Sequence, residues 1–254
     1  MVANAKLIGW GARVLYLGPA LGLTPHRNAT AVLAVALDGE LEVADDPADP
    51  NAAYRCARSV FVPPNTLHHL RIAGGSMAFL YVDPLSRDLD ALRARMLDLT
   101  RRAGFGLINE AAMIEVLTGL GEGRIAVRDG RQALGELLGI GMGADTDVRI
   151  VAALRQMRDE PHRSHSLTEL GKCAGLSASR FLHLFKAATG VPLRRYRLWN
   201  RMGAAVGAVH DGMSLTEAAH AAGFASSAHF SAAFRDMFGM MPSELLKTLE
   251  PVHH

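Results

Sequence analysis

One stretch of sequence occurs twice in the last third of the chain, and this repeat constrains the fold more than any other feature. The copies occupy residues 166–190 and 214–239, and both begin with Ser-Leu-Thr-Glu. Ser166 and Ser214, the first residues of the two copies, lie 48 positions apart. So many matches at one offset indicate a structural unit that is present twice.

Each copy has the residue order of a helix-turn-helix. Its Ser-Leu-Thr-Glu is a capping box, in which the Ser oxygen caps the N3 amide and the Glu reaches back to the Ser amide. Gly175 and Gly223 then end the first helix, because glycine adopts the left-handed conformation that a sharp turn needs. Apolar residues at helical spacing predict a second helix in each copy, and residues 192–209 predict a long helix between the copies.

Short motifs in the two copies match one known family. They are Ala174-Gly175-Leu176-Ser177, Ser179-Arg180, His183-Leu184-Phe185-Lys186 and Gly190 in the first copy, and Ala222-Gly223-Phe224, His229-Phe230-Ser231, Phe234-Arg235, Gly239 and Pro242-Ser243-Glu244 in the second. In these motifs the chain resembles the AraC/XylS family of bacterial transcription regulators. The resemblance implies that residues 147–254 form an all-helical DNA-binding domain, with both recognition helices on one face of the DNA, one turn apart.

The outward faces of the two recognition helices supply the predicted DNA contacts. The predicted residues are Ser179, Arg180, Leu182, His183, Lys186, Ser227, His229 and Arg235. The resemblance places base contacts at Ser179, Leu182 and His183. Arg180 and Lys186 are expected to hold phosphates, with a base as the alternative for Arg180.

The second copy has shorter polar side chains on its outward face. Ala232 stands where many family members carry a long polar residue, so we expect the first copy to make most of the sequence discrimination and Arg235 to contact phosphate. Between Arg163 and Arg201 there are eight Lys or Arg residues and one acidic residue. Such a local excess of positive charge suits phosphate binding, although a solvated basic face gives the same pattern.

Residues 7–82 predict short strands separated by turns. Strands are expected at 12–17, 29–37, 40–43, 59–62, 69–72 and 77–82, with hairpin turns at Asp38-Gly39 and Gly74-Gly75. Such a pattern indicates a sandwich or small barrel. Residues 63–70 are similar to the second motif of the cupin barrel, and residues 22–28 to a degraded first motif. The predicted fold class is therefore α+β with two domains, a cupin-like barrel at 1–84 and the helical domain at 147–254.

The mouth of this barrel is the predicted site of a small-molecule effector. Its candidate lining residues are Tyr16, His26, Arg27, Phe61, His68, Phe79 and Tyr81, and an ordinary core or surface role is the alternative for each. The cupin resemblance implies a metal set of two close His, a Glu and a distant His, but here the second His of the first motif is missing. His26 with His68 or His69 supplies only two or three nitrogens. We therefore expect no metal and no cofactor.

Residues 85–138 predict helices that follow the barrel. Apolar residues at alternating spacings of four and three predict an amphipathic helix over 85–103 with a heptad-like stripe. The stripe is a predicted homodimer interface, with packing on the same chain's barrel as the alternative, and its members are Leu85, Leu89, Leu92, Met96 and Leu99. Further helices are expected at 108–120 and 129–138, and the glycine-rich residues 139–146 are the predicted linker.

The sequence thus predicts a cytoplasmic, homodimeric regulator that binds promoter DNA and senses a small molecule. RNA polymerase is a further partner if the protein activates transcription. Nothing approaches the roughly 18 consecutive apolar residues of a membrane span, and two cysteines are too few for a disulfide framework. We expect no enzyme activity. Two alternatives stay open: a metal-dependent cupin enzyme with an accessory helical domain, and a ligand-free regulator that is controlled by its abundance.

Overall fold

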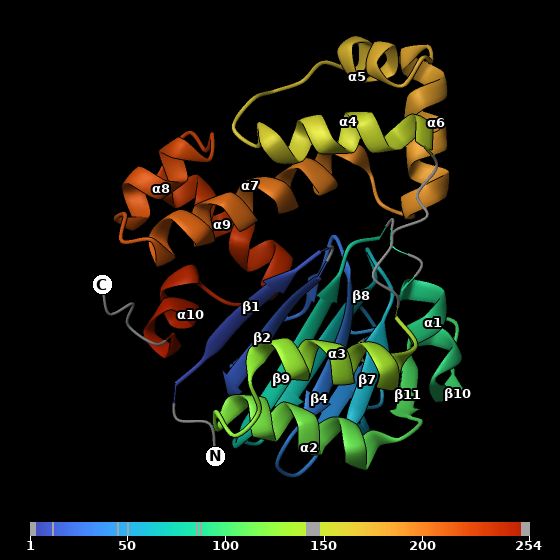
Figure 1. Cartoon of the computed structure of the whole chain (residues 1–254), viewed down its shortest axis with the longest axis vertical. Coiled ribbons are helices and arrows are strands. Elements are labelled where there is room, and N and C mark those ends of the chain that lie inside the picture. The colour runs from blue at the N-terminus through green and yellow to red at the C-terminus, as the bar shows by residue number, and fades with distance from the viewer. Residues whose placement is uncertain are drawn as a thin grey trace. The chain divides into compact units, whose positions relative to one another are not determined.

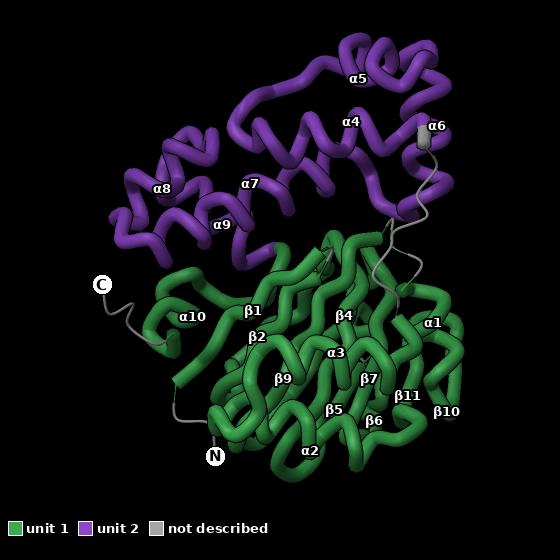
Figure 2. Tube along the Cα trace, in the orientation of Figure 1, with its two compact units in different colours: residues 1–144, 237–250 green, residues 145–236, 251–254 purple. Residues whose placement is uncertain are grey.

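The computed structural model describes residues 4–11, 13–44, 46–49, 51–84, 86, 88–140 and 148–249. The chain divides into two compact units (Figure 2). The first contains residues 1–144 and 237–250, and the second contains residues 145–236 and 251–254. The boundary at 144 falls in the predicted linker 139–146, of which residues 141–146 lie outside the described residues.

The first unit is built on two antiparallel sheets. The larger sheet has, in spatial order, β1 (Lys6–Trp10), β2 (Arg13–Pro19), β9 (Ser76–Val82), β4 (Ala31–Ala36), β7 (Ser59–Val62), β11 (Gly104–Leu107) and β10 (Met96–Leu99). The smaller sheet has β3 (His26–Arg27), β8 (Leu67–Ile72), β5 (Leu41–Ala44) and β6 (Arg55–Ala57). The strands therefore form a two-sheet, cupin-like arrangement and not one continuously hydrogen-bonded barrel.

Helices cover one face of the seven-stranded sheet. They are α1 (Asp88–Ala94), α2 (Glu110–Gly121) and α3 (Val127–Leu138), and Figure 1 shows α2 and α3 running across the sheet. Leu15, Leu33, Phe61 and Leu80 share this face by register and are buried together with Leu117 of α2. Full burial of each such side chain stabilises the fold by roughly 1.5–3 kcal/mol. This layer is therefore the principal core of the first unit.

The opposite face of the same sheet is buried as well. Tyr16, Phe79, Ala34 and Val60 share it by register, and all four have 2% exposure or less. Because the helices cover the other face, we infer that the four-stranded sheet covers this one, with the buried Leu70 among its inward residues.

All six predicted strands are present, but the two predicted hairpins are wrong. β4 and β5 flank Asp38-Gly39, yet β4 pairs with β7 and β9, whereas β5 pairs with β6 and β8. β8 and β9 flank Gly74-Gly75 and also belong to different sheets. The glycines do adopt the positive φ that such turns need, at +71° for Gly39 and +83° for Gly75. Turn residues thus predicted where the chain reverses, but the pairing partner depends on strands that are distant in sequence.

The predicted helix over 85–103 is wrong after residue 94. α1 covers only Asp88–Ala94, and the next residues form β10, which pairs with β11. Leu92 and Met96 are buried in the core of their own unit, and Leu89 packs against that core. Leu99 is 46% exposed, on a strand, while Leu85 lies outside the described residues. These residues therefore do not form one continuous seam for a second chain.

A tight turn explains why the helix does not continue. The Thr100 hydroxyl accepts hydrogen bonds from the amides of Arg102, at 3.2 Å, and Ala103, at 2.9 Å. The Thr100 amide donates to the Ala103 carbonyl at 2.8 Å, which closes the reversal between β10 and β11. A Cβ at Gly104 would lie 2.6 Å from the Met96 side chain, so glycine permits the close strand pair. Tertiary pairing here outweighs the helical spacing of the apolar residues.

The two later helices of the first unit agree with prediction. α2 and α3 lie within two residues of the expected ranges 108–120 and 129–138. Gly139 ends α3 in the left-handed conformation, at φ 66°.

The last part of the chain also belongs to the first unit. Residues 237–250 contain the end of α9 and the helix α10 (Pro242–Thr248). The Ala5 amide donates to the Thr248 carbonyl at 2.6 Å, and the Asn28 side chain donates to the Met237 carbonyl at 2.8 Å. The unit boundary thus lies inside the predicted domain 147–254.

The second unit is all helical. It contains α4 (Val148–Asp159), α5 (Leu167–Cys173), α6 (Ala178–Thr189), α7 (Leu193–His210), α8 (Leu215–Ala221) and most of α9 (Ser227–Phe238). In Figure 1, α5 and α6 lie toward one end of α7, and α8 and α9 lie toward its other end. The 18 residues of α7 span about 27 Å. Among the described residues, no helix has both the length and the hydropathy needed to cross a bilayer.

A buried ion pair between Arg13 on β2 and Asp88 on α1 generates the first prediction. The Arg13 Nε lies 2.7 Å from the Asp88 Oδ2, and the two side chains are 7% and 2% exposed. Asp88→Asn leaves a buried guanidinium without its counter-charge, so we expect a loss of about 3–5 kcal/mol in the free energy of unfolding. Urea denaturation followed by Trp10 fluorescence, in a Trp199→Phe background, measures this loss.

Asp98→Asn is the matched control. Asp98 pairs with Arg55 at 2.6 Å, but these side chains are 56% and 47% exposed, so the expected loss is only about 0–1 kcal/mol. Equal losses in the two variants would contradict a structural role for the buried pair.

Candidate nucleic-acid interface

Serine and glutamate side chains begin the first helix of both helix-turn-helix units. The hydroxyls of Ser166 and Ser214 accept hydrogen bonds from the amides of Glu169, at 3.1 Å, and Glu217, at 3.3 Å. Each Glu carboxylate in turn accepts from the serine amide, so both predicted capping boxes are present. Hydrogen bonds from the serines lower the pKa of the Glu169 and Glu217 carboxyls.

Glycine is required at the turn of both units. Gly175 and Gly223 have φ values of +66° and +82°. A Cβ at Gly223 would also lie 2.7 Å from the carbonyl oxygen of His162. Backbone conformation and a close approach therefore both exclude a side chain at the second turn.

The first recognition helix, α6, divides cleanly into a buried and an exposed face. Phe181 and Phe185 are fully buried, and the Phe185 ring packs edge-on against Tyr196 of α7 at 5.4 Å. The five predicted contact residues of this helix are all exposed, and they are Ser179, Arg180, Leu182, His183 and Lys186. Leu182 is 39% exposed although it is apolar. An exposed Leu on this face suits contact with a thymine methyl group.

The second recognition helix, α9, presents a shorter polar face. Phe230 and Phe234 are buried, His229 and Arg235 are exposed, and Ser227 is half-buried. The His229 ring packs edge-on against Phe224 at 5.5 Å, which restrains it. With Ala232 also exposed on this helix, α9 offers fewer long polar side chains than α6.

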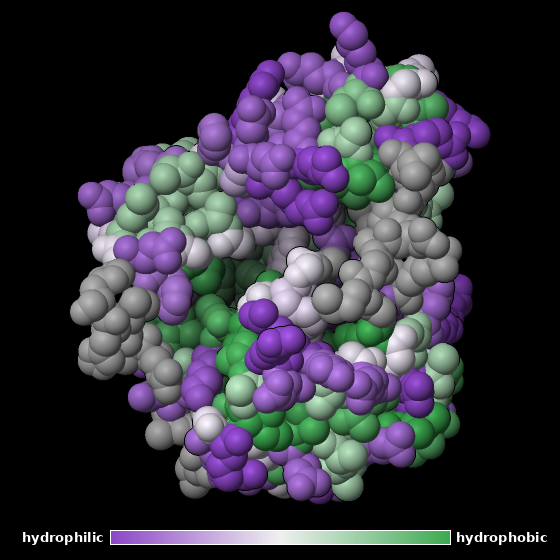
Figure 3. Space-filling view, in the orientation of Figure 1, coloured by the Kyte–Doolittle hydropathy of each residue, from purple (hydrophilic) through white to green (hydrophobic). Residues whose placement is uncertain are grey.

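Three of the four arginines on α7 hold the second unit together. Arg195 pairs with Asp236 at 3.2 Å, Arg197 donates to the His165 carbonyl, and Arg201 donates to the Pro161 carbonyl at 3.2 Å. Arg194 is exposed. Most arginines on this helix therefore bind groups of the protein itself, although the charge pattern alone favours phosphate contacts. In Figure 3 hydrophilic residues dominate α4 and α5 on the face in view, whereas α8 is more apolar.

The effector candidates of the first unit form two clusters. Tyr16, Phe79 and Tyr81 follow one another with ring centroids 5.9 Å and 6.2 Å apart, on the seven-stranded sheet. His26 and His68 lie opposite each other in register on β3 and β8, with ring centroids 4.3 Å apart. Burial raises the pKa of Tyr16 to about 12 and also raises the pKa of Tyr81. Both tyrosines are therefore neutral at physiological pH.

Two of the candidates are not brought to these clusters. Phe61 lies in the helix-covered core, on the face opposite to Tyr16 and Phe79, because it pairs with Leu33. Arg27 is exposed and donates to the Asn65 carbonyl at 3.1 Å.

His68 is a buried, neutral histidine. It is 0% exposed, its Nδ1 lies 2.9 Å from the Thr66 carbonyl, and its Nε2 has no partner among the described residues. Burial, and secondarily the neighbouring His26, lower the pKa of His68 to about 3. His69 already uses both ring nitrogens, with the Tyr54 hydroxyl at 2.6 Å and the Leu23 carbonyl at 2.9 Å. In the described part of the chain, no three His, Cys, Asp or Glu side chains converge as a metal site.

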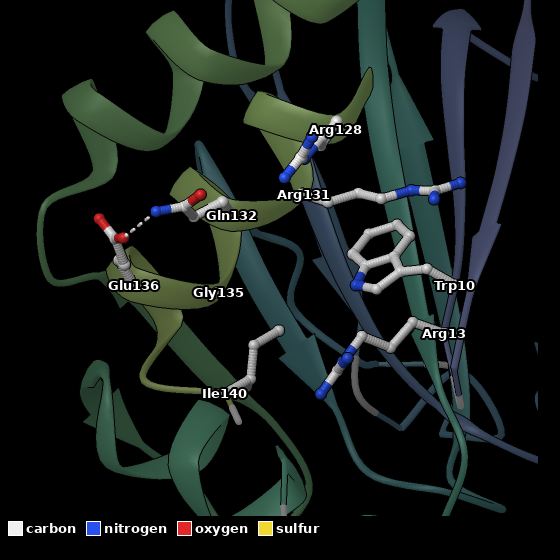
Figure 4. A pocket seen from close by; sticks show the side chains of 8 residues that line it. All are labelled: Trp10, Arg13, Arg128, Arg131, Gln132, Gly135, Glu136 and Ile140. Carbon is white, nitrogen blue, oxygen red and sulfur yellow. Dashed lines mark hydrogen bonds between the residues drawn. The ribbon is translucent and has the colours of Figure 1, made fainter. Parts of the chain in front are cut away.

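A cavity in the first unit was not predicted from the sequence. It has a volume of about 590 Å³ and is shown in Figure 4. The lining residues are Trp10, Arg13, Arg128, Arg131, Gln132, Gly135, Glu136 and Ile140. The available signal was the spacing of Arg128, Arg131 and Gln132, which places them on one stripe of α3.

Comparison with known proteins identifies the repeated region. A family model described as a helix-turn-helix domain matches residues 170–248. The probable transcriptional regulator LumQ of Photobacterium leiognathi is 35% identical over 79 residues, which cover 31% of this chain and 32% of LumQ. The match thus spans about a third of the length of that relative.

Solved structures show the fold of nearly the whole chain. ToxT from Vibrio cholerae O395 superimposes with a TM-score of 0.63 and 11% identity, covering 95% of this chain and 99% of ToxT. ToxT of V. cholerae strain SCE256 with a bound unsaturated fatty acid gives a TM-score of 0.58 and 13% identity, with full coverage of both chains. At these identities the likeness concerns the fold alone.

Residues 170–248 therefore form a helix-turn-helix domain, a class of domain that binds DNA. That domain is of the AraC type, and it is combined with an N-terminal β-rich domain in the architecture of ToxT.

His68 generates a pH-dependent prediction. The unfolded chain protonates this imidazole near pH 6.5, while the folded chain does so only near pH 3. The unfolded state therefore binds more protons in between, and the stabilisation linked to His68 is complete above pH 6.5 and is lost as the pH falls toward 3. From pH 7.5 to pH 5, we therefore expect the Tm of the natural chain to fall relative to the Tm of His68→Gln.

Calorimetric scans of both proteins at several pH values measure this difference, and histidines that are not coupled to His68 cancel in the subtraction. A difference in Tm that is constant between pH 7.5 and pH 5 would show that His68 titrates normally.

Proposed function

We propose that the protein is a sequence-specific regulator of transcription in the cytoplasm whose DNA binding responds to a small-molecule effector held by the first unit. The observation that carries the proposal is the duplicated helix-turn-helix, with two capped units and exposed polar residues along both recognition helices. No catalytic role is assigned to any residue.

The first recognition helix supports base readout. Ser179, Leu182 and His183 are exposed on one face of α6, where a hydroxyl, an apolar group and an imidazole suit different base edges in the major groove. Arg180 and Lys186 flank them and suit phosphate contact, which fixes the register of the helix on the duplex. On α9, Arg235 is the corresponding phosphate ligand, and Ser227 and His229 are its base-facing neighbours.

The interior of the first unit supports ligand sensing. Tyr16, Phe79 and Tyr81 offer aromatic surface, and His68 offers a buried Nε2 without a partner among the described residues. A largely apolar interior with a few polar groups is typical of ligand pockets, and ToxT, which shares this fold, has been solved with an unsaturated fatty acid. The effector regulates only if it binds one state of the protein better than another.

A homodimer is part of the proposal, because two linked half-site contacts raise the affinity for DNA through effective concentration. Its interface must use residues other than Leu92 and Met96, which are buried within their own chain. RNA polymerase is a further partner if the protein activates transcription.

A selection of genomic fragments by the purified full chain, at two salt concentrations, tests the DNA-binding part. We expect enrichment of a short repeated sequence that survives the higher salt. Enrichment that is uniform across fragments and disappears with salt would reflect phosphate attraction only and would overturn the proposal.

The exposure of the two recognition helices predicts an unequal division of labour. Because His183 is exposed and Ser227 is half-buried, we expect His183→Ala to relax base preference at one position by about 1–3 kcal/mol and Ser227→Ala to change it much less. A selection on randomised sites with each variant measures the preference. Equal relaxation by the two variants would contradict this division.

A further inference from the structure

The 590 Å³ cavity lies on the helix-covered face of the seven-stranded sheet, at the edge formed by β1 and β2. Trp10 and Arg13 are paired in register and share a face with Ile8 and Leu15, two residues of the principal core. Tyr16 points to the opposite face, because successive residues of a strand alternate. The cavity is therefore separate from the interior clusters described above.

One stripe of α3 forms the other wall. Its cavity-lining residues recur at spacings of three and four, as neighbours on one helix face do, and are Arg128, Arg131, Gln132, Gly135 and Glu136. Figure 4 shows the backbone of α3 across the cavity from Trp10 and Arg13, with the Arg131 side chain extending over the Trp10 ring toward β1. Leu134 and Leu138 form a different stripe of the same helix and are buried in the core. The polar stripe is thus held in place by an apolar stripe beside it.

The charges around the cavity favour an anion. Arg13 is matched by Asp88 in the buried ion pair, and Glu136 accepts a hydrogen bond from Gln132 at 3.1 Å. Arg128 and Arg131 then leave an excess of one positive charge after Glu136 is counted. A partly enclosed cavity strengthens the attraction of such an excess for an anion, because water screens it less.

Arg131 is positioned to hold that anion. Its Nη2 donates to the Gly9 carbonyl at 2.8 Å, and its Cζ lies 5.8 Å from the centre of the Trp10 ring. Its Nε is buried and has no partner among the described residues. The guanidinium is thus oriented by β1 and Trp10, and its planar group suits a carboxylate, which accepts two parallel hydrogen bonds from such a group.

The rest of the cavity wall suits a flat apolar body. Trp10 is half-buried and shows its indole to the cavity, Ile140 is 7% exposed, and Gly135 contributes no side chain. An indole face binds a second aromatic ring by offset stacking or edge-on contact. The volume lies in the range of small-molecule sites, about 300–1,000 Å³.

We propose that this cavity binds a small aromatic carboxylate, with the carboxylate on Arg131 and Arg128 and the ring between Trp10 and Ile140. Such a ligand would act as an effector only if the proposed regulatory function holds, whereas the binding itself does not depend on it.

Isothermal titration calorimetry of the full chain tests the site with 2-naphthoate, its neutral analogue 2-naphthamide, and inorganic phosphate. We expect 2-naphthoate to bind at least about tenfold more tightly than either other probe, and Arg128→Gln and Arg131→Gln each to weaken it about tenfold, as expected for a lost hydrogen bond to a charged group. Arg101→Gln, with the same change in charge at an exposed site, should bind like the natural chain.

Three outcomes would overturn the proposal. The first is no binding of 2-naphthoate, or binding no tighter than that of the amide. The second is unchanged affinity in Arg128→Gln, which removes an exposed side chain and so remains informative if Arg131→Gln does not fold. The third is loss of binding in His68→Gln alone, which would place the acid in the interior of the unit. The selection of DNA fragments without any acid gives its result independently, so failure of the site and failure of the regulatory function are distinguishable.

Discussion

The burial of β4 on both faces is the constraint on which the first unit depends. All six of its residues are buried, so every strand beside it has to present apolar residues in two directions. One direction meets α2 and α3, and the other meets the second sheet. Because neighbours along a strand alternate, this arrangement sorts adjacent residues into different environments. Leu15 enters the helix-covered core, while the next residue, Tyr16, enters the space between the sheets.

Features with short-range causes were predictable from the sequence. A capping box, a turn glycine and an apolar stripe each involve residues within a few positions of one another, so their signals survive without knowledge of the rest of the fold. Both capping boxes and the long helix α7 are present. The exposed face of α6 follows from the burial of Phe181 and Phe185, since a helix that buries one stripe exposes the opposite one.

Features with long-range causes were not predictable in the same way. Met96 has the spacing of a heptad residue, but its backbone pairs with β11, which in turn pairs with β7, a strand that is distant in sequence. Phe61 has the size and polarity of a pocket residue, but its register with Leu33 directs it to the helices. The arginines of α7 resemble a phosphate-binding row, yet three of them bind groups that are distant in sequence. In each case the residue type is uninformative until its neighbours are known.

At the cavity beside α3, residues that are distant in sequence turn a pattern typical of a solvated helix face into part of a cavity wall. A run such as Arg128-Asp129-Gly130-Arg131-Gln132 normally indicates a solvated helix face. Here that stripe lines a cavity, because the edge strand β1 and its neighbour β2 supply Trp10 and Arg13 as lining residues of the same cavity. Arg13 also anchors α1 through Asp88, so the cavity wall is continuous with the buried ion pair that ties helix to sheet. A ligand bound only by the folded unit would therefore stabilise the contact between the sheet and its helices. Through that contact, occupancy of the cavity would affect the stability of the first unit as a whole.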